Sequence, residues 1–425
     1  MKKAAIWLLI ALAAVPLLTV SIAFYPAIEG KIVAYRAAAF LVVLITFMIS
    51  IGKDQEVFLK SVREKLRSPI VIAVTTSMLT IGISTLFAQD RFSAFFGELS
   101  RGEGFVTFFS LYVLFVAMAV FFDRRAWRAS AIITSIASII MILVQFSQLA
   151  PLNTRPSALM ANPIFLAGWY LFAVFAGMYL MRISTKGQIW LRVLGIVAII
   201  ASVYGILLTR TRGTLLAMVI SALICAGIAA VYGKGIMMGK YSLRKVGLWI
   251  AGVVVVFGFL FGLTSNAKVW SRIPGLDRVA EISTDTSTIQ SRVLFLQISK
   301  KGFGESSALR KTVGWGWDNY GYFWNANYDP AVYLFDQSYA DRAHNKLVDM
   351  LIMTGIIGLL AYLWIWVTFL RASVRMIPRD PRLAFALLFV SISYFLHNLV
   401  AFDMPVILFL FYALLAFVVT TSYEK

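Results

Sequence analysis

Long apolar runs separated by short polar segments make up most of the chain. About twelve of these runs approach the roughly 20 residues that a helix needs to cross the hydrocarbon core of a bilayer. The pattern predicts an all-α polytopic membrane protein with about twelve spans. The predicted spans run near Ile6 to Phe24, Ile32 to Ile51, Pro69 to Phe87, Phe105 to Phe122, Ala129 to Leu149, Pro163 to Met181, Trp190 to Leu208, Gly213 to Tyr232, Val246 to Leu263, Leu347 to Leu370, Leu383 to Leu399 and Met404 to Thr421.

Positive charges are distributed unevenly between the connections. Most of the 39 Lys and Arg residues fall in one alternating set of short connections and at the termini. Lys and Arg in short loops stay on the cytoplasmic side of a membrane. We therefore expect both termini in the cytoplasm. The basic start followed by an apolar run is interpreted as the first span rather than as a cleaved signal peptide.

Only one connection is long, and this topology places it on the outer side of the membrane. The predicted parts are nine spans in residues 1-264, an extracytoplasmic loop in 265-344 and three spans in 345-425. The first half of the loop has helical periodicity, with Ile289, Val293 and Leu296 on one stripe. From Gly314 to Tyr339 the loop is rich in Trp, Tyr, Phe, Asn, Asp and Gly and has no helical or alternating pattern.

Composition excludes several classes of protein. At 60% hydrophobic and 14% charged residues, with a mean hydropathy of +0.83, the chain is too apolar for a water-soluble globule. One cysteine, Cys225, excludes an internal disulfide and a cysteine-based zinc site, and two histidines leave little for a histidine metal centre. The net charge of +19 is dispersed between apolar spans, which suits topology and anionic lipids rather than nucleic acid. We expect membrane lipids as partners, and no metal, cofactor or nucleic acid.

Four arginines lie at the outer ends of spans or in the outer loop, against the charge bias. Arg101 stands between small residues before a span, and Arg292 lies in the predicted loop helix. Arg210 and Arg212 flank a tight turn, where two cations repel unless an anion or a carboxylate compensates. Guanidinium groups bind phosphate oxygens bidentately, and a helix start adds unpaired N–H groups. The pattern predicts phosphate binding. The alternative is anchoring at lipid headgroups or pairing with nearby acids.

His344 lies where the long loop re-enters the membrane, and Asp341 precedes it by three residues. An imidazole can take a proton from a hydroxyl group, and a carboxylate can orient the ring. The alternative role is a polar cap for the tenth span, and the residues alone leave both open. His397, in an apolar run, is interpreted as an interhelical hydrogen-bonding group.

The aromatic part of the loop is the third candidate feature. Aromatic rings interleaved with carboxylates and amides suit the faces and hydroxyl groups of sugars. A membrane-interface belt is the alternative. The candidate glycan-binding residues are Trp315, Trp317, Asp318, Asn319 and Tyr320.

Taken in order, these segments resemble the O-antigen ligase and polymerase-type membrane glycosyltransferases over about Phe95 to Phe417. The most specific piece is His344-Asn345, followed after nine residues by Gly355 and after two more by Gly358. The weaker pieces are Gly97 to Gly104, Ala161 to Gly168, Thr209 to Gly213, and Ser291-Arg292 with Gly314 to Tyr320. Glu98 and Glu103 beside Arg101 depart from the family pattern, as does Thr211, where many relatives have Ser.

The resemblance implies a GT-C type fold and transfer of a glycan from an undecaprenyl-diphosphate carrier to an acceptor hydroxyl, with inversion and without metal. It implies the outer face of a bacterial inner membrane as the place of reaction. The implied roles are catalytic base for His344, diphosphate binding for Arg101, Arg210, Arg212 and Arg292, sugar binding for the aromatic segment, and support from Asp341 and Asn345.

The acceptor stays open among a glycolipid such as lipid A core, a growing glycan and a protein. Ligase, glycan polymerase and protein O-oligosaccharyltransferase are therefore alternatives within the family. A transporter or flippase of an anionic lipid-linked substrate is a more distant alternative, which inverted repeats and broken spans in matching positions would favour, and we find neither.

Overall fold

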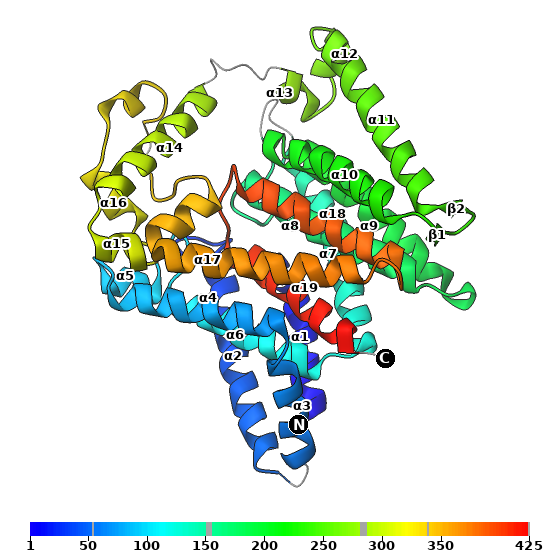
Figure 1. Ribbon diagram of the computed structural model, residues 1–425, viewed down its shortest axis with the longest axis horizontal. Helices are drawn as coiled ribbons and strands as arrows, with labels where there is room; N and C mark the ends of the chain where they lie inside the picture. Colours follow the sequence, from blue (N-terminus) through cyan, green and yellow to red (C-terminus); the bar gives the residue numbers. More distant parts are fainter. Residues whose placement is uncertain (53–54, 150–154, 281–286, 338–339, 424–425) are drawn as a thin grey trace. The chain divides into compact units, whose positions relative to one another are not determined.

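The computed structural model describes residues 1–52, 55–149, 155–280, 287–337 and 340–423, which are nearly all helical (Figure 1). The chain divides into two compact units, each built from stretches that are far apart in the sequence. The first comprises Met1–Ser130, Ser283–Phe369 and Asn398–Lys425, and the second comprises Ala131–Ile282 and Leu370–His397.

The first unit contains most of the helices at both ends of the chain, together with most of the long loop. They are α1 (Lys2–Ala11), η1 (Leu12–Leu17), α2 (Glu29–Ser50), α3 (Gln55–Leu66), α4 (Pro69–Leu86), α5 (Arg91–Phe96), α6 (Phe105–Phe121), α14 (Ser287–Glu305), α15 (Ala308–Val313), α16 (Tyr320–Ala326), η3 (Pro330–Leu334) and α19 (Pro405–Tyr423). Two boundaries between the units fall inside α7 (Arg124–Ser147) and α17 (Lys346–Arg375).

Helix α19 forms the centre of the first unit and is buried along nearly its whole length. The ring of Phe409 stacks on Tyr35 of α2 at 4.7 Å, and Tyr412 lies 6.0 Å from Phe115 of α6. At its other end, Thr420 accepts a hydrogen bond of 2.9 Å from the indole of Trp127. A helix that is apolar on all sides lies in a protein core or in lipid, and for α19 neighbouring helices supply the apolar surroundings.

The second unit holds the central helices of the chain and one short hairpin. They are α8 (Pro163–Ile183), η2 (Lys186–Gln188), α9 (Ile189–Leu208), α10 (Arg212–Tyr232), β1 (Met237–Met238), β2 (Tyr241–Ser242), α11 (Leu243–Thr264), α12 (Lys268–Ser271), α13 (Leu276–Ala280) and α18 (Pro381–Asn398). The two strands pair antiparallel. Helix α8 starts where Asn162 accepts from the N–H of Ile164 at 2.8 Å and Pro163 fixes the first turn.

Eight helices of the described residues are long and apolar enough to cross a membrane: α2, α4, α7, α8, α9 with η2, α10, α11 and α17. Helices α6 and α19 are shorter apolar helices, and α18 covers a further predicted span. The chain is thus a nearly all-α multi-pass membrane protein, with eight candidate spans where the sequence predicted about twelve.

The predicted first span, from Ile6 to Phe24, is wrong as one continuous helix. Helix α1 ends at Ala11, and a 3-10 turn that contains Pro16 follows. Proline lacks the N–H that an α-helix needs in its interior, and its ring clashes with the preceding turn. The apolar run is long enough to cross a bilayer, but the helix is interrupted.

Helix α14 covers the loop segment with helical periodicity, but the apolar stripe of Ile289, Val293 and Leu296 is not its buried face. Val293 and Leu296 are each 42% exposed. The buried side consists of Ser291, Phe295, Ile298 and Ser299. Because two of these four residues are serines, the hydrophobic pattern of the sequence does not reveal this face. The segment after Gly314 contains the short helix α16 and the turn η3, which its composition did not indicate, while residues 338–339 lie outside the described part of the chain.

Candidate functional site

A break in α17 holds the aromatic loop in the first unit. Gly355 has a φ of 69° inside this helix, so the regular backbone pattern stops there. The carbonyls of Ile352 and Met353, just before the break, accept hydrogen bonds of 2.9 and 3.0 Å from the loop amides of Trp315 and Gly316. A helix that is interrupted satisfies its backbone groups with other partners, and here the loop supplies the donors.

Two glycines permit this close contact. A Cβ at Gly355 would lie 2.2 Å from the carbonyl oxygen of Thr312, and a Cβ at Gly314 would lie 2.2 Å from that of Met353. Both glycines have a left-handed φ. The first of the paired glycines in the family-like motif therefore fixes the position of the loop rather than contacting a ligand.

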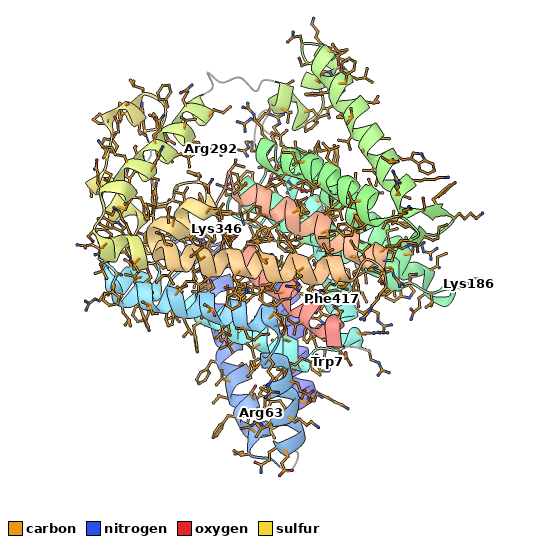
Figure 2. All side chains as sticks on the ribbon, viewed as in Figure 1. Trp7, Arg63, Lys186, Arg292, Lys346 and Phe417 are labelled. Carbon is orange, nitrogen blue, oxygen red and sulfur yellow. The ribbon has the colours of Figure 1, made fainter. Side chains whose placement is uncertain are left out.

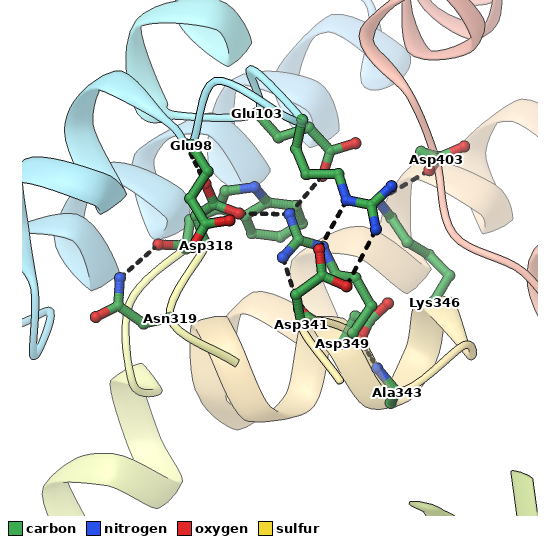
Figure 3. A network of polar contacts seen from close by, with 12 residues as sticks. Glu98, Glu103, Asp318, Asn319, Asp341, Ala343, Lys346, Asp349 and Asp403 are labelled. Atoms are coloured by element: carbon green, nitrogen blue, oxygen red, sulfur yellow. Dashed lines mark hydrogen bonds and ion pairs between the residues drawn. The ribbon is translucent and has the colours of Figure 1, made fainter. Parts of the chain in front are cut away.

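Arg342 forms a buried charge cluster with Glu103 and Asp318, the two acids labelled in Figure 3. Its guanidinium donates to the carboxylate of Glu103 at 2.9 Å and to that of Asp318 at 2.5 Å. All three side chains are at most 3% exposed. Asp318 also accepts from the N–H of Glu98 at 2.7 Å. The cluster joins the segment before α6, the aromatic loop and the segment before α17.

Burial and charge oppose each other within this cluster. Burial raises the pKa of Glu103, although the charge of Arg342 opposes this shift. Burial alone would lower the pKa of Arg342, but Asp318 and Glu103 outweigh it and raise the pKa well above its usual value. The guanidinium therefore stays charged and compensates the buried acids.

Two further ion pairs surround the cluster. Arg101 donates to both oxygens of Asp341, at 2.7 and 3.2 Å. Lys346, at the start of α17 (Figure 2), lies 2.8 Å from Asp403, and both are buried. The bidentate geometry of the first pair is the one that guanidinium groups also use for phosphate.

Hydrogen bonds fix the backbone on both sides of His344. Asn345 caps α17, because its side-chain oxygen accepts from the amides of Leu347 at 3.0 Å and Val348 at 3.2 Å. Its amide group donates to the carbonyl of Leu399 at 3.0 Å. His344 itself has a φ of 54°, an unusual conformation for a residue with a side chain.

The imidazole of His344 packs between two phenyl rings. Phe402 lies 5.0 Å and Phe295 5.8 Å from it, centroid to centroid. On the Phe402 ring lies the guanidinium of Arg101, 4.5 Å from the ring centre. The imidazole makes no hydrogen bond to another described side chain, and Nδ1 is buried. Burial, and then the charge of Arg292 on α14 (Figure 2), lower the pKa of His344 to about 4.

The predicted role of Asp341 as the partner that orients His344 needs correction. Its two carboxylate oxygens bind Arg101 instead. Burial would raise the pKa of Asp341, but the Arg101 hydrogen bond and the charges of Arg342 and Arg101 outweigh it and lower the pKa. Asp341 therefore acts on His344 through its charge and not through a hydrogen bond. Its carboxylate is instead the ion-pair partner of the Arg101 guanidinium.

Four of the five predicted sugar-binding residues are enclosed by protein: Trp317, Asp318, Asn319 and Tyr320. Direct contact with a glycan is thus excluded for them in this conformation. Trp317 packs edge-on against Phe108 at 4.6 Å, and the hydroxyl of Tyr320 lies 3.0 Å from that of Ser299. Asn319 exchanges hydrogen bonds with the backbone of Asp90 at 2.6 and 3.1 Å. Only Trp315 is partly exposed, and Arg310 covers its ring.

The other two predicted arginines lie in the second unit, where α10 begins at Arg212. Arg210 has a φ of 51° and lies 3.7 Å from the carboxylate of Asp277. Arg155 donates to the carbonyl of Thr209 at 3.0 Å and to the hydroxyl of Thr211 at 3.3 Å, which holds the turn.

His397 also belongs to the second unit. Its Nδ1 forms a hydrogen bond of 2.8 Å with the hydroxyl of Thr214, and the side chain is buried. This contact agrees with the interpretation of His397 as a hydrogen-bonding group inside the helix bundle.

Residues with an unfavourable positive φ lie mostly in the segments that resemble the O-antigen ligase family. Five residues other than glycine have a positive φ in the described part of the chain: Ala158, Ala161, Arg210, Asp318 and His344. All but Ala158 lie in those segments. Each such conformation costs about 1–3 kcal/mol and persists only where the surroundings enforce it, as functional sites often do.

The sequence interpretation missed the role of several charged residues: Glu103, Arg342, Lys346, Asp349 and Asp403. Arg342 stands two residues before the predicted catalytic residue, and Glu103 was considered as a partner of the outer arginines such as Arg101 and as a departure from the family pattern, whereas it pairs with Arg342. These residues could have been noticed in the sequence because acidic and basic side chains close to apolar spans are costly unless they are paired. Which acid pairs with which base follows only from the fold, because partners such as Glu103 and Arg342 are 239 residues apart. Among the described residues, no group of three or more His, Cys, Asp or Glu is arranged to hold a metal ion.

Comparison with known proteins supports the family resemblance. Residues 196–363 match the Wzy_C family model, described as O-antigen ligase. This confirms the resemblance predicted from the sequence, and the matched region includes Arg210, Arg212, Arg292, His344 and Gly355. No match was found among curated proteins. The match covers residues 196–363, which is less than half of the chain.

Proposed function

We propose that this chain, with its O-antigen ligase region, transfers a glycan from an undecaprenyl-diphosphate carrier to an acceptor hydroxyl, with His344 as the general base. The acceptor oxygen attacks the anomeric carbon and forms the new glycosidic bond. The bond from that carbon to the diphosphate oxygen breaks, and the diphosphate leaves with the electron pair. The hydroxyl proton goes to His344. A single displacement inverts the anomeric configuration.

The observation that carries this proposal is that Asn345, not His344, caps α17. The structural alternative for His344 was a helix cap, and that position is already filled. The imidazole is held in a strained turn, packs between two phenyl rings and makes no hydrogen bond to another described residue, so no polar structural role accounts for a histidine here. Burial lowers the pKa of His344, which leaves the ring neutral and able to accept a proton but also makes it a weaker base than a free imidazole.

Arginines supply the charge that a leaving diphosphate requires. In the first unit, Arg101 is linked to His344 through the shared Phe402 ring, and Arg292 is near enough to lower the imidazole pKa. In the second unit, Arg210 and Arg212 flank the start of α10, where backbone N–H groups favour anions. We propose Arg101 and Arg292 of the first unit as donor-binding residues in a reaction that needs no metal. For Arg210 and Arg212, the family resemblance alone carries the same proposal.

The reaction is proposed for the outer face of a bacterial inner membrane, with both termini cytoplasmic and about twelve spans. The acceptor class distinguishes a ligase, which uses a glycolipid, from a polymerase, which uses a growing glycan, and from a protein O-oligosaccharyltransferase. Purified protein in liposomes with one lipid-linked donor and these three acceptors separates them. Release of the donor to the opposite leaflet without any glycosidic product would instead indicate a flippase.

The central test is His344→Ala, measured as transfer and as donor binding in the same liposomes. We expect normal donor affinity and a loss of turnover of about a hundred- to ten-thousandfold, as for other positioned bases. His397→Asn is the matched control, since it removes the other imidazole while keeping a polar group for Thr214. It should retain most activity. Wild-type turnover in His344→Ala would refute the proposal.

A further inference from the structure

Asp349 reaches back across the strained turn at His344. One of its carboxylate oxygens accepts a hydrogen bond of 2.7 Å from the backbone N–H of Ala343 (Figure 3). Asp349 is 1% exposed, and its other oxygen is buried without a hydrogen-bond partner among the described residues. A carboxylate in the first turns of a helix usually bonds the amide at the cap itself. Here it bonds an amide beyond the cap, and His344 lies between the two.

Helix stability does not explain this buried acid. Asn345 already accepts from the amides of Leu347 and Val348. Lys346, the nearest cation in sequence, pairs with Asp403. No ion pair within 4 Å involves Asp349 among the described residues, and a half-satisfied carboxylate away from water is costly. Its one described hydrogen bond is with the amide of Ala343, the residue before His344, while Arg342 and Lys346 act on it through their charges.

Each neighbour of His344 in the chain is therefore fixed by its own polar contact. Arg342 is anchored by Glu103 and Asp318, the Ala343 amide by Asp349, and Asn345 by the carbonyl of Leu399. The Ala343 contact holds the peptide between Arg342 and Ala343, one residue before the left-handed φ of His344. A hydrogen bond there offsets part of the cost of a conformation that a residue other than glycine avoids.

We propose that Asp349 is a positioning residue for His344, which fixes the backbone turn that aims the imidazole at the acceptor. This inference rests on the proposed function of His344 as the base. It assigns Asp349 no contact with substrate. Small displacements of a catalytic group cost turnover rather than binding, since the group must be aligned with the reacting atoms.

The test compares Asp349→Leu with Asp349→Asn, two variants of similar volume. Leucine removes the acceptor for the Ala343 amide, while asparagine keeps one oxygen. We expect Asp349→Leu to lower kcat about ten- to a hundredfold with an unchanged KM for the lipid-linked donor. Asp349→Asn should stay within about threefold of the wild type. If the leucine variant fails to insert, Asp349→Glu moves the carboxylate by one methylene and should lose kcat while keeping the charge.

A double-mutant cycle separates positioning from general destabilisation. If Asp349 acts through His344, adding Asp349→Leu to His344→Ala should not reduce the residual turnover further. A further tenfold reduction would overturn the proposal, as would wild-type kcat in a folded Asp349→Leu protein or an equal loss in Asp349→Asn. Wild-type turnover in His344→Ala would instead refute the proposed function, so the two failures are distinguishable.

Discussion

Replacing Arg342 with methionine tests the buried charge cluster directly. Methionine fills a similar volume along the stem and removes the guanidinium, so Glu103 and Asp318 lose their common partner. Removing one member of a buried ion pair costs about 3–5 kcal/mol, because an uncompensated charge stays away from water. That is about two to more than three orders of magnitude in the unfolding equilibrium constant. All three side chains are at most 3% exposed, so solvent does not reduce this cost.

The assay is reversible unfolding in mixed micelles, followed by tryptophan fluorescence and repeated at high salt. Arg342→Met should unfold at a much lower denaturant concentration, and salt should have little effect on the difference. The triple variant with Glu103→Gln and Asp318→Asn should recover most of the loss. No charge of the cluster is then buried, and the amide side chain introduced at position 318 still offers an oxygen to the N–H of Glu98. An unchanged midpoint in Arg342→Met, or no recovery in the triple variant, would refute this reasoning.

Three further predictions concern pH, the broken helix and metal. Because a falling pH protonates His344 only near its lowered pKa of about 4, kcat/KM of the wild type should be flat from pH 8 to about 6. An ascending limb centred near 6.5 in a pH–rate profile would contradict the described environment of the ring. Gly355→Ala should lower the thermal midpoint and the activity, since its Cβ would lie 2.2 Å from the carbonyl of Thr312, while Gly187→Ala, with nothing within 4 Å, is the neutral control. Activity should persist in EDTA, and loss restored by Mg²⁺ or Mn²⁺ in a transfer assay would count against a metal-free reaction.

Apolar periodicity predicted most helices, because span length is set by bilayer thickness and is visible in one sequence. It failed at Pro16, where a short-range backbone effect interrupts a run that is long enough. It also gave the wrong face of α14, because Ser291 and Ser299 pack inward while Val293 and Leu296 are exposed. Hydrophobicity alone does not identify which face of a short loop helix meets its neighbours.

The sequence predicted several residues that lie together at the candidate site, but it assigned wrong partners to some of them. His344, Arg101 and Asn345 were identified from position and motif, and the structure places them around one turn. The partner of Asp341 was assigned from a spacing of three residues, whereas its actual partner, Arg101, is 240 residues away. The loop aromatics were expected to face a ligand, but the backbone contacts between the loop and α17 turn Trp317 and Tyr320 inward. Such long-range pairings depend on the fold, which a single sequence does not display.

The ion cluster also constrains how the protein is made. Glu103 precedes Arg342 by 239 residues, so during synthesis its carboxylate enters the folding chain long before its guanidinium partner exists. Until the segment before α17 is translated, the acid has only a proton to neutralise it. A chain that stops before Arg342 therefore retains a buried acid without this partner, next to an apolar helix. The stability of the segment before α6 thus depends on synthesis having reached position 342.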